Sequence, residues 1–196
     1  MTKVVYYLWL LAGCAITAKS QPLEFRYFSP APSARDAAHT GEPPCARLRL
    51  GRVTPGAYLQ FRIAHRDSAV ELDLYETLRW TERPDTYVRR ALSDALFEHQ
   101  PLAQALADDA VTLEIDVIAF EEVQRQGRHG GRVQLGYALR DARNVLDRGV
   151  VTFERDARGA AIEHVVTAIG AALEAASAEV ARRVRLQVCR TTPFER

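Results

Sequence analysis

Residues 111–139, VTLEIDVIAFEEVQRQGRHGGRVQLGYAL, decide the fold class of this chain. Apolar and polar residues alternate over 111–117 and again over 133–139, which is the period of a strand with one buried face. The glycine-rich stretch GRHGGR predicts a hairpin loop between the two strands. A turn at 141–144 then leads into a further strand that ends near Glu154. The stretch therefore predicts a meander of three antiparallel strands.

The segments on either side of the meander supply two helices and more strands. Residues 159–183 place apolar side chains three and four positions apart, which predicts a long helix with one buried face. Ahead of the meander, alternation predicts strands near 46–53, 59–63 and 70–74. A shorter helix follows them. It begins at Pro84-Asp85, with proline in the first turn and an acid at the positive end of the helix dipole, and it stops before Pro101.

This order of elements predicts an α/β (α+β) fold, in which two helices pack on one face of a largely antiparallel or mixed sheet. A chain of 196 residues with 47% hydrophobic content is long enough for one buried core. We expect a single domain over 45–189, followed by a short tail at 190–196.

The first residues resemble the signal of a bacterial lipoprotein. Lys3 precedes the apolar run 4–11, and Leu11-Ala12-Gly13-Cys14 resembles a lipobox. The resemblance implies that residues 1–13 are removed, that Cys14 carries diacylglycerol and palmitate, and that 14–44 is a lipidated tether. Because Ala15 is not aspartate, the resemblance also implies sorting to the outer membrane. The alternative is a buried first strand with an ordinary core cysteine.

Residues 57–84, AYLQFRIAHRDSAVELDLYETLRWTERP, carry a second resemblance. A strand ending at Arg66, and an alternating strand that runs into Arg79-Trp80 and a proline-started helix, resemble the ABC-type transport auxiliary lipoproteins of the PqiC type. The resemblance extends from Cys14 to about Val184. It implies a fold similar to the N-terminal domain of TolB. It also implies partners: a mammalian-cell-entry (MCE) protein and the permease and ATPase of a lipid transporter.

The resemblance leads to a functional prediction. We expect an accessory lipoprotein that faces the periplasm from the outer membrane and acts as a docking adaptor for the MCE assembly. Two alternatives are a lipid-binding carrier and an envelope-maintenance lipoprotein unrelated to transport. Homo-oligomer formation is left open.

Arg66, Arg79 and Trp80 admit two roles. In the first, Trp80 is buried beneath the shorter helix, and an arginine stacks on its ring. In the second, the three residues belong to an edge that contacts a partner. The position of a tryptophan between a strand and a helix favours the first.

Composition and spacing exclude several other functions. A net charge of +1, with 26 basic and 25 acidic side chains, does not provide the positive surface that nucleic acid requires. The five histidines have no spacing typical of metal ligands, so we expect neither metal nor cofactor. Glu121 and Glu122 are adjacent on a strand and point to opposite faces, so they do not form an acid/base pair. We expect no enzymatic activity.

Two cysteines remain if Cys14 carries lipid. Cys45 precedes the first strand of the domain, and Cys189 follows the predicted last helix. An oxidising envelope compartment permits a disulfide between them, provided that their Cα atoms lie within about 7 Å. Two free thiols are the equal alternative.

Overall fold

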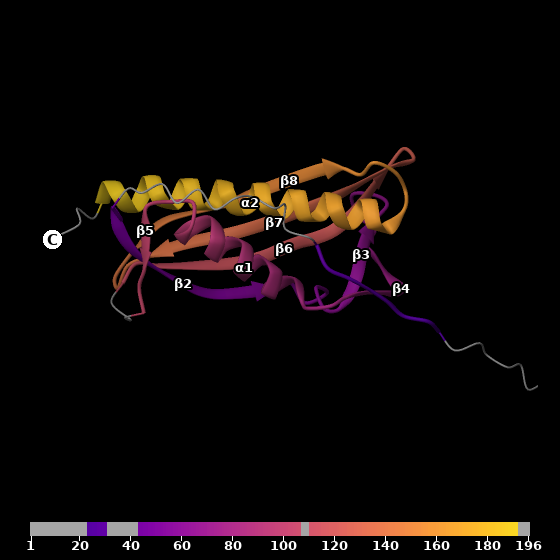
Figure 1. The fold of residues 1–196 in the computed structure, drawn as a ribbon, viewed down its shortest axis with the longest axis horizontal. Coiled ribbons are helices and arrows are strands. Elements are labelled where there is room, and N and C mark those ends of the chain that lie inside the picture. The colour runs from indigo at the N-terminus through magenta and orange to yellow at the C-terminus, as the bar shows by residue number, and fades with distance from the viewer. Residues whose placement is uncertain (1–22, 31–42, 107–109, 192–196) are drawn as a thin grey trace, which may run out of the picture.

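A computed structural model describes residues 23–30, 43–106 and 110–191 (Figure 1). Within these ranges it has two helices and eight strands. In chain order the elements are β1 Arg26–Phe28, β2 Ala46–Pro55, β3 Arg62–Arg66, β4 Asp73–Trp80, α1 Pro84–Phe97, β5 Leu102–Gln104, β6 Thr112–Arg125, β7 Arg128–Arg140, β8 Val145–Asp156 and α2 Ile162–Thr191.

Strand β6 is the centre of the sheet. On one side it pairs with β7 in antiparallel fashion along its whole length, and β8 pairs with β7 in the same way. On its other side, β2 runs parallel to the first half of β6, and β3 runs parallel to the second half. Strand β4 is antiparallel to β3, β1 is parallel to β4, and β5 is parallel to β2. The sheet is therefore mixed.

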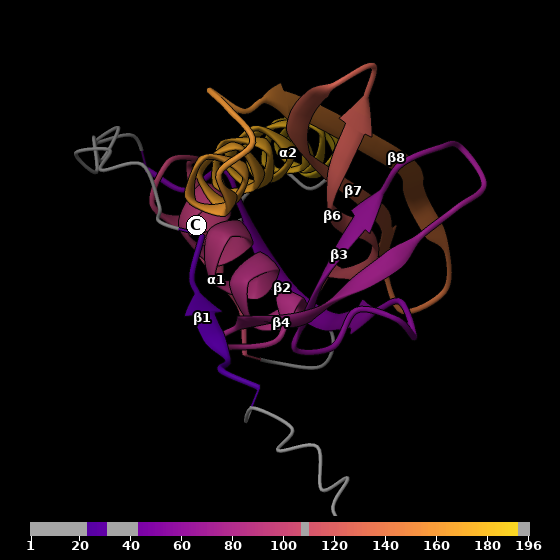
Figure 2. The same cartoon turned by 90° about the vertical axis from the view of Figure 1, so that its right-hand side faces the viewer.

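Both helices cover the same face of this sheet and pack against each other (Figures 1 and 2). Helix α2 lies along β7 and β8, and α1 lies over β2. The predicted fold class is confirmed. The inner face of α2 is apolar and buried, and its buried residues include Val165, Ile169, Leu173, Ala176, Val180, Val184 and Val188.

The first hairpin of the meander differs from the prediction. The GRHGGR stretch is not a loop, because β7 begins at Arg128 and the turn consists of Gln126 and Gly127, with φ of 51° and 76°. Two residues with positive φ are typical of the tight turn that joins twisted antiparallel strands. Strand β6 also continues past Val117. A register shift next to Ile118 interrupts its alternation, and beyond it residues on both faces of the strand are buried.

Gly131 allows α2 to approach the sheet closely. A Cβ atom at this position would lie 2.2 Å from the backbone nitrogen of Ile169 and 2.6 Å from the carbonyl carbon of Ala168. No side chain can occupy that space unless the helix moves away from β7. We predict that Gly131→Ala lowers the free energy of unfolding by about 3 kcal/mol, measured by chemical denaturation, because the core must be repacked around the new methyl group.

Gly136, in the same strand, provides the control for this prediction. A Cβ atom there would meet the Cδ1 atom of Ile118 at 3.4 Å, which is an ordinary van der Waals contact. Gly136→Ala should therefore change the free energy of unfolding by less than about 1 kcal/mol. Equal losses in the two variants would show that the approach of α2 does not depend on Gly131.

Three other boundaries differ from the prediction. Strand β4 begins at Asp73, so Val70, which is 93% exposed, lies in the connection before it. The hydroxyl of Ser68 accepts hydrogen bonds from backbone groups of this connection and stabilises a turn. Helix α2 continues to Thr191, so Cys189 lies inside the helix rather than after it. Strand β1 lies within the segment predicted as a tether.

Candidate functional site

Trp80 is a core residue. Its side chain is 1% exposed, and its ring packs edge-on against Phe120 and Tyr87, with ring centroids 5.2 Å and 6.1 Å away. Tyr87 comes from α1, so the tryptophan lies beneath that helix as the first reading expected. The stacked arginine is not found: among the described residues, no arginine lies over the Trp80 ring.

Arg79 holds the first strand against the sheet. Its guanidinium lies over the ring of Phe25, 4.8 Å from the centroid, and donates hydrogen bonds to the carbonyl oxygens of Tyr75 and Leu78. Tyr27 of β1 pairs with Arg79 across the parallel strands. Arg79 therefore fastens the segment before β1 to β4 through its charge and its planar group.

Arg66 binds a buried carboxylate that the sequence did not assign to it. Its Nε donates to Oε1 of Glu121 at 2.9 Å, and Glu121 is 0% exposed. Arg132 pairs with the same oxygen. The hydroxyl of Tyr58 shares its one proton between the other oxygen, at 3.1 Å, and the carbonyl oxygen of Ile118, at 2.9 Å. The hydrogen bond to Glu121 raises the pKa of Arg66. Burial, together with the negative charge of Glu121, raises the pKa of Tyr58.

Glu122 forms a separate polar cluster on the opposite face of β6. The hydroxyl of Tyr75 donates to its Oε2 at 2.6 Å, and Nδ1 of His129 lies 2.6 Å from its Oε1. Glu122 is 1% exposed. Burial and the hydrogen bond to Glu122 raise the pKa of Tyr75. His65 packs its ring against Tyr75, with centroids 4.6 Å apart.

The two carboxylates do not form one reactive site. They are adjacent in a strand and point to opposite faces, as expected, and each is enclosed by its own donors. Their role is to fix strands: Glu121 connects β6 to β3 and β7, and Glu122 connects β6 to β4 and β7. The sequence contained a signal for this arrangement, because two acids inside the apolar run VIAFEEV must find partners if they are buried.

The arginines of the GRHGGR stretch have different environments. Arg132 forms an ion pair with the buried carboxylate of Glu121, so its role is structural. Arg128 is exposed at the start of β7.

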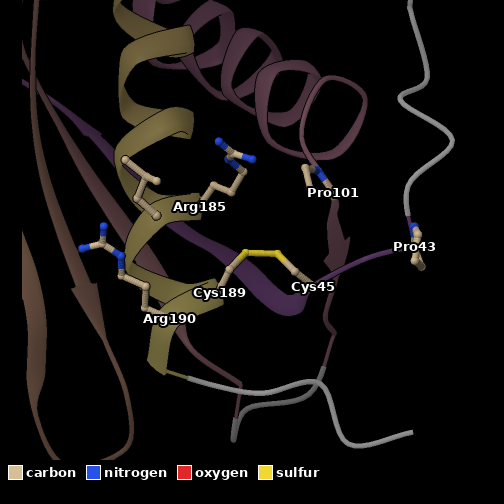
Figure 3. A pocket seen from close by; sticks show the side chains of 7 residues that line it. Pro43, Cys45, Pro101, Arg185, Cys189 and Arg190 are labelled. Atoms are coloured by element: carbon tan, nitrogen blue, oxygen red, sulfur yellow. A yellow bond between two sulfur atoms is a disulfide. The ribbon is translucent and has the colours of Figure 1, made fainter.

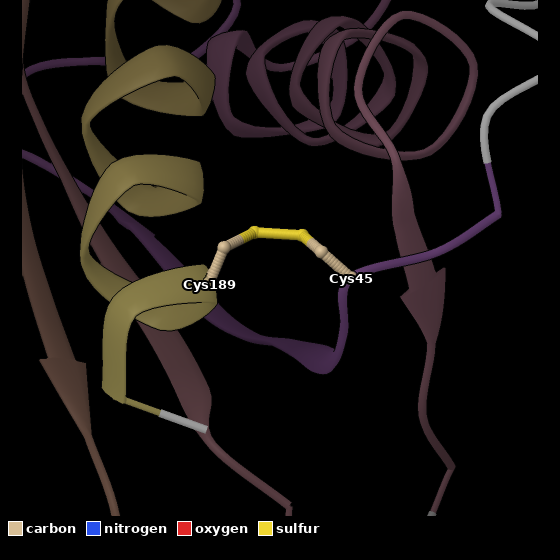
Figure 4. The surroundings of a disulfide bond; sticks show 2 residues. All are labelled: Cys45 and Cys189. Atoms are coloured by element: carbon tan, nitrogen blue, oxygen red, sulfur yellow. A yellow bond between two sulfur atoms is a disulfide. The ribbon is translucent and has the colours of Figure 1, made fainter. Parts of the chain in front are cut away.

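The two cysteines of the domain lie together at the C-terminal end of α2. Cys45 and Cys189 are joined by a disulfide, with Cα atoms 5.5 Å apart (Figure 4). The bridge connects the start of β2 to the last turns of α2. An open cavity of about 390 Å³ lies beside it (Figure 3). Formation of the bridge in the exported protein stays a prediction.

The described residues contain no group of three or more histidine, cysteine or acidic side chains that could hold a metal ion. Neither described helix is sufficiently long and apolar to cross a bilayer. Cys14, the predicted site of lipidation, lies outside the described residues.

Comparison with known proteins identifies the family. A family model for the ABC-type transport auxiliary lipoprotein component matches residues 28–181, which include strands β2 to β8, helix α1 and most of α2. The chain belongs to this family. The resemblance recognised at Arg66 and Arg79-Trp80 is thereby confirmed. This family of auxiliary transport lipoproteins is not a family of enzymes, and it acts in the cell envelope in association with a transport system.

Solved structures show the same fold. XCC0632 of Xanthomonas campestris aligns with a TM-score of 0.71 and 19% identity, over 83% of this chain and 96% of that one. The hypothetical protein CT253 of Chlamydia trachomatis aligns with a TM-score of 0.56 and 10% identity, over 74% of this chain and 99% of that one. No curated protein matches the sequence. At these identities the likeness concerns the fold alone.

Proposed function

We propose that this auxiliary lipoprotein is anchored in the outer membrane by acyl chains on Cys14 and docks an MCE-type lipid-transport assembly from the periplasm. The match of residues 28–181 to the auxiliary-component family carries the proposal. The lipobox-like Leu11-Ala12-Gly13-Cys14 supports the anchor, and Ala15 supports the outer membrane. Two or more acyl chains hold a protein on a membrane where one chain does not.

The geometry favours an adaptor over a lipid carrier. The space between sheet and helices is filled by one continuous cluster of buried apolar side chains. The cavity beside the disulfide is open to solvent and has arginines in its wall. A carrier needs an enclosed apolar cavity for acyl chains. The described residues therefore favour contact with a partner over enclosure of a lipid.

The anchor is tested by fractionating cells that express the chain. We predict that the wild-type protein is found in the outer-membrane fraction with lipid on Cys14, detected by mass spectrometry, and that Cys14→Ser moves it to the soluble fraction. A variant with Cys45→Ser and Cys189→Ser is the matched control and should stay in the membrane. A soluble wild-type protein that retains Met1 would contradict the anchor.

Docking is tested on the same membranes. After detergent extraction, an MCE protein, permease and ATPase should co-purify with the full-length lipoprotein. The carrier alternative makes a different prediction: the purified lipoprotein alone would remove labelled phospholipid from vesicles, with one lipid bound per protein. That result, without co-purification, would replace the adaptor by the carrier.

A further inference from the structure

The cavity beside the disulfide has an apolar wall. Pro43, Pro101, the Cys45–Cys189 bridge and Leu186 of α2, which is 37% exposed, line it (Figure 3). With a volume of about 390 Å³ and an open mouth, the cavity suits one or two side chains of a bound segment rather than an enclosed small molecule.

Arg185 brings a positive charge into this apolar setting. It extends from α2 toward Pro101 (Figure 3). Its Nε atom is buried and has no hydrogen-bond partner among the described residues. The Arg185 side chain as a whole is half-buried in the cavity wall. A carboxylate that pairs with its guanidinium there gains more than the same contact in water. The cavity is therefore a site for an anion.

Two neighbouring arginines of α2 already pair with an acid, whereas Arg185 pairs with no acid among the described residues. Arg182 and Arg183 both bind Glu179, and these hydrogen bonds lower the pKa of Glu179 to about 2. Arg190 lies exposed in the last turn of α2, on the cavity wall. Its charge offsets the negative end of the helix dipole, which would otherwise disfavour an anion here.

The position of the cavity indicates what kind of molecule carries the anion. Arg26 of β1 contacts Glu163 in the first turn of α2, whereas Cys189 lies in its last turns. Cys189 lies 26 positions after Glu163 in the helix, which corresponds to roughly 39 Å. If the N-terminal segment leads to the membrane, as the proposed function holds, the cavity lies at the end of the domain away from that membrane. A protein can reach it there more readily than a lipid of the same bilayer.

We propose that this cavity binds an acidic peptide segment of a protein partner. A carboxylate of the segment accepts hydrogen bonds from the Arg185 guanidinium, and an adjacent apolar side chain packs against Pro101, Leu186 and the disulfide. Arginine suits this role because its planar group binds a carboxylate with two parallel hydrogen bonds.

The test is a selection of displayed random hexapeptides with free carboxyl termini on the immobilised full-length protein in detergent. We expect enrichment of peptides in which an aspartate, a glutamate or the terminal carboxylate adjoins a large apolar residue. An enriched peptide should bind at least ten-fold more weakly to Arg185→Gln. Arg182→Gln, on the same helix but outside the cavity, is the matched control and should bind like the wild type.

A second variant removes the concern that loss of Arg185 disturbs the fold. Leu186→Asp leaves both arginines in place and adds a negative charge to the cavity wall, so it should also weaken binding at least ten-fold while the melting temperature stays near that of the wild type. Binding should weaken as salt is raised.

The remaining outcomes overturn the proposal. If no peptide enriches, or if Arg185→Gln and Leu186→Asp bind as well as the wild type, the cavity is not a peptide site. If phosphatidylglycerol vesicles or inorganic phosphate bind in an Arg185-dependent way and peptides do not, the anion belongs to a lipid or to free phosphate. Because the selection needs no transporter, its failure is distinguishable from failure of the adaptor function.

Discussion

Glu121→Gln should lower the free energy of unfolding by about 3 to 5 kcal/mol, measured by chemical denaturation. The wild-type carboxylate is 0% exposed and pairs with Arg66 and Arg132, whose side chains are 20% and 19% exposed. The neutral amide leaves Arg66 without a counter-charge and leaves Arg132 with only the Glu154 carboxylate, 3.9 Å from its Nη1. Breaking a buried ion pair from one side costs this amount. The Tyr58 hydroxyl also exchanges a charged acceptor for a neutral one.

An exposed ion pair provides the control. Nη2 of Arg90 donates to both carboxylate oxygens of Glu82, and the side chains of Glu82 and Arg90 are 41% and 60% exposed. Glu82→Gln should cost less than about 1 kcal/mol, because water screens the pair. Arg132→Met combined with Glu121→Gln should cost less than the sum of the single changes, since the two residues share one interaction. A loss below 1 kcal/mol for Glu121→Gln would show that the cluster is not a stabilising element.

Loss of the disulfide should lower the stability by a similar amount. The bridge closes a loop with a sequence separation of 144 residues, and the chain-entropy model assigns about 5 kcal/mol to a loop of this length. Both cysteines are half-buried. We expect the exported protein to migrate faster on a non-reducing gel than on a reducing one, and to lose at least about 2 kcal/mol of unfolding free energy when reductant is added.

The double variant Cys45→Ser, Cys189→Ser is the control for reduction. Its stability should equal that of the reduced wild type and should not respond to reductant. Thiol counting after denaturation gives an independent measurement. Two free thiols at Cys45 and Cys189 in protein exported to the periplasm would contradict the predicted disulfide.

The alternation of apolar and polar residues predicted the long strands, because one face of most of the sheet is polar. Glu114 and Asp116 are exposed while Leu113, Ile115 and Val117 between and beside them are buried, so the period of two is visible in the sequence. The same signal fails after Ile118. There the strand is bulged and covered on both faces, and a run of buried residues has no period that distinguishes a strand.

The predicted last helix was too short at its C-terminal end, for a different reason. Val180, Val184 and Val188 continue its buried face with a spacing of four, but the arginines between them obscured the pattern. These long polar side chains lie at the edges of the buried face of the helix and do not interrupt it. Extending the count by two turns would have placed Cys189 within the helix.

The candidate site was only partly predictable. The resemblance drew attention to Arg66 and Arg79 but not to their contacts, because Arg66 and Glu121 are 55 positions apart and meet only through the register of β3 on β6. Local periodicity does not encode register between distant strands. The cavity beside Arg185 likewise depends on the end of α2 meeting the starts of β2 and β5, which no single segment specifies.

If the predicted disulfide forms in the exported protein, it also determines how the protein carries mechanical load. Residues 45–189 then form a covalent ring that contains every described element except β1 and the last two residues of α2. A pull on the N-terminal side first peels the three paired residues of β1 from β4 and breaks the contact of Arg26 with Glu163. Tension then arrives at Cys45. If a partner is held beside Arg185, the force passes through the sulfur bridge into the last turns of α2, and the sheet and its core lie outside the line of tension.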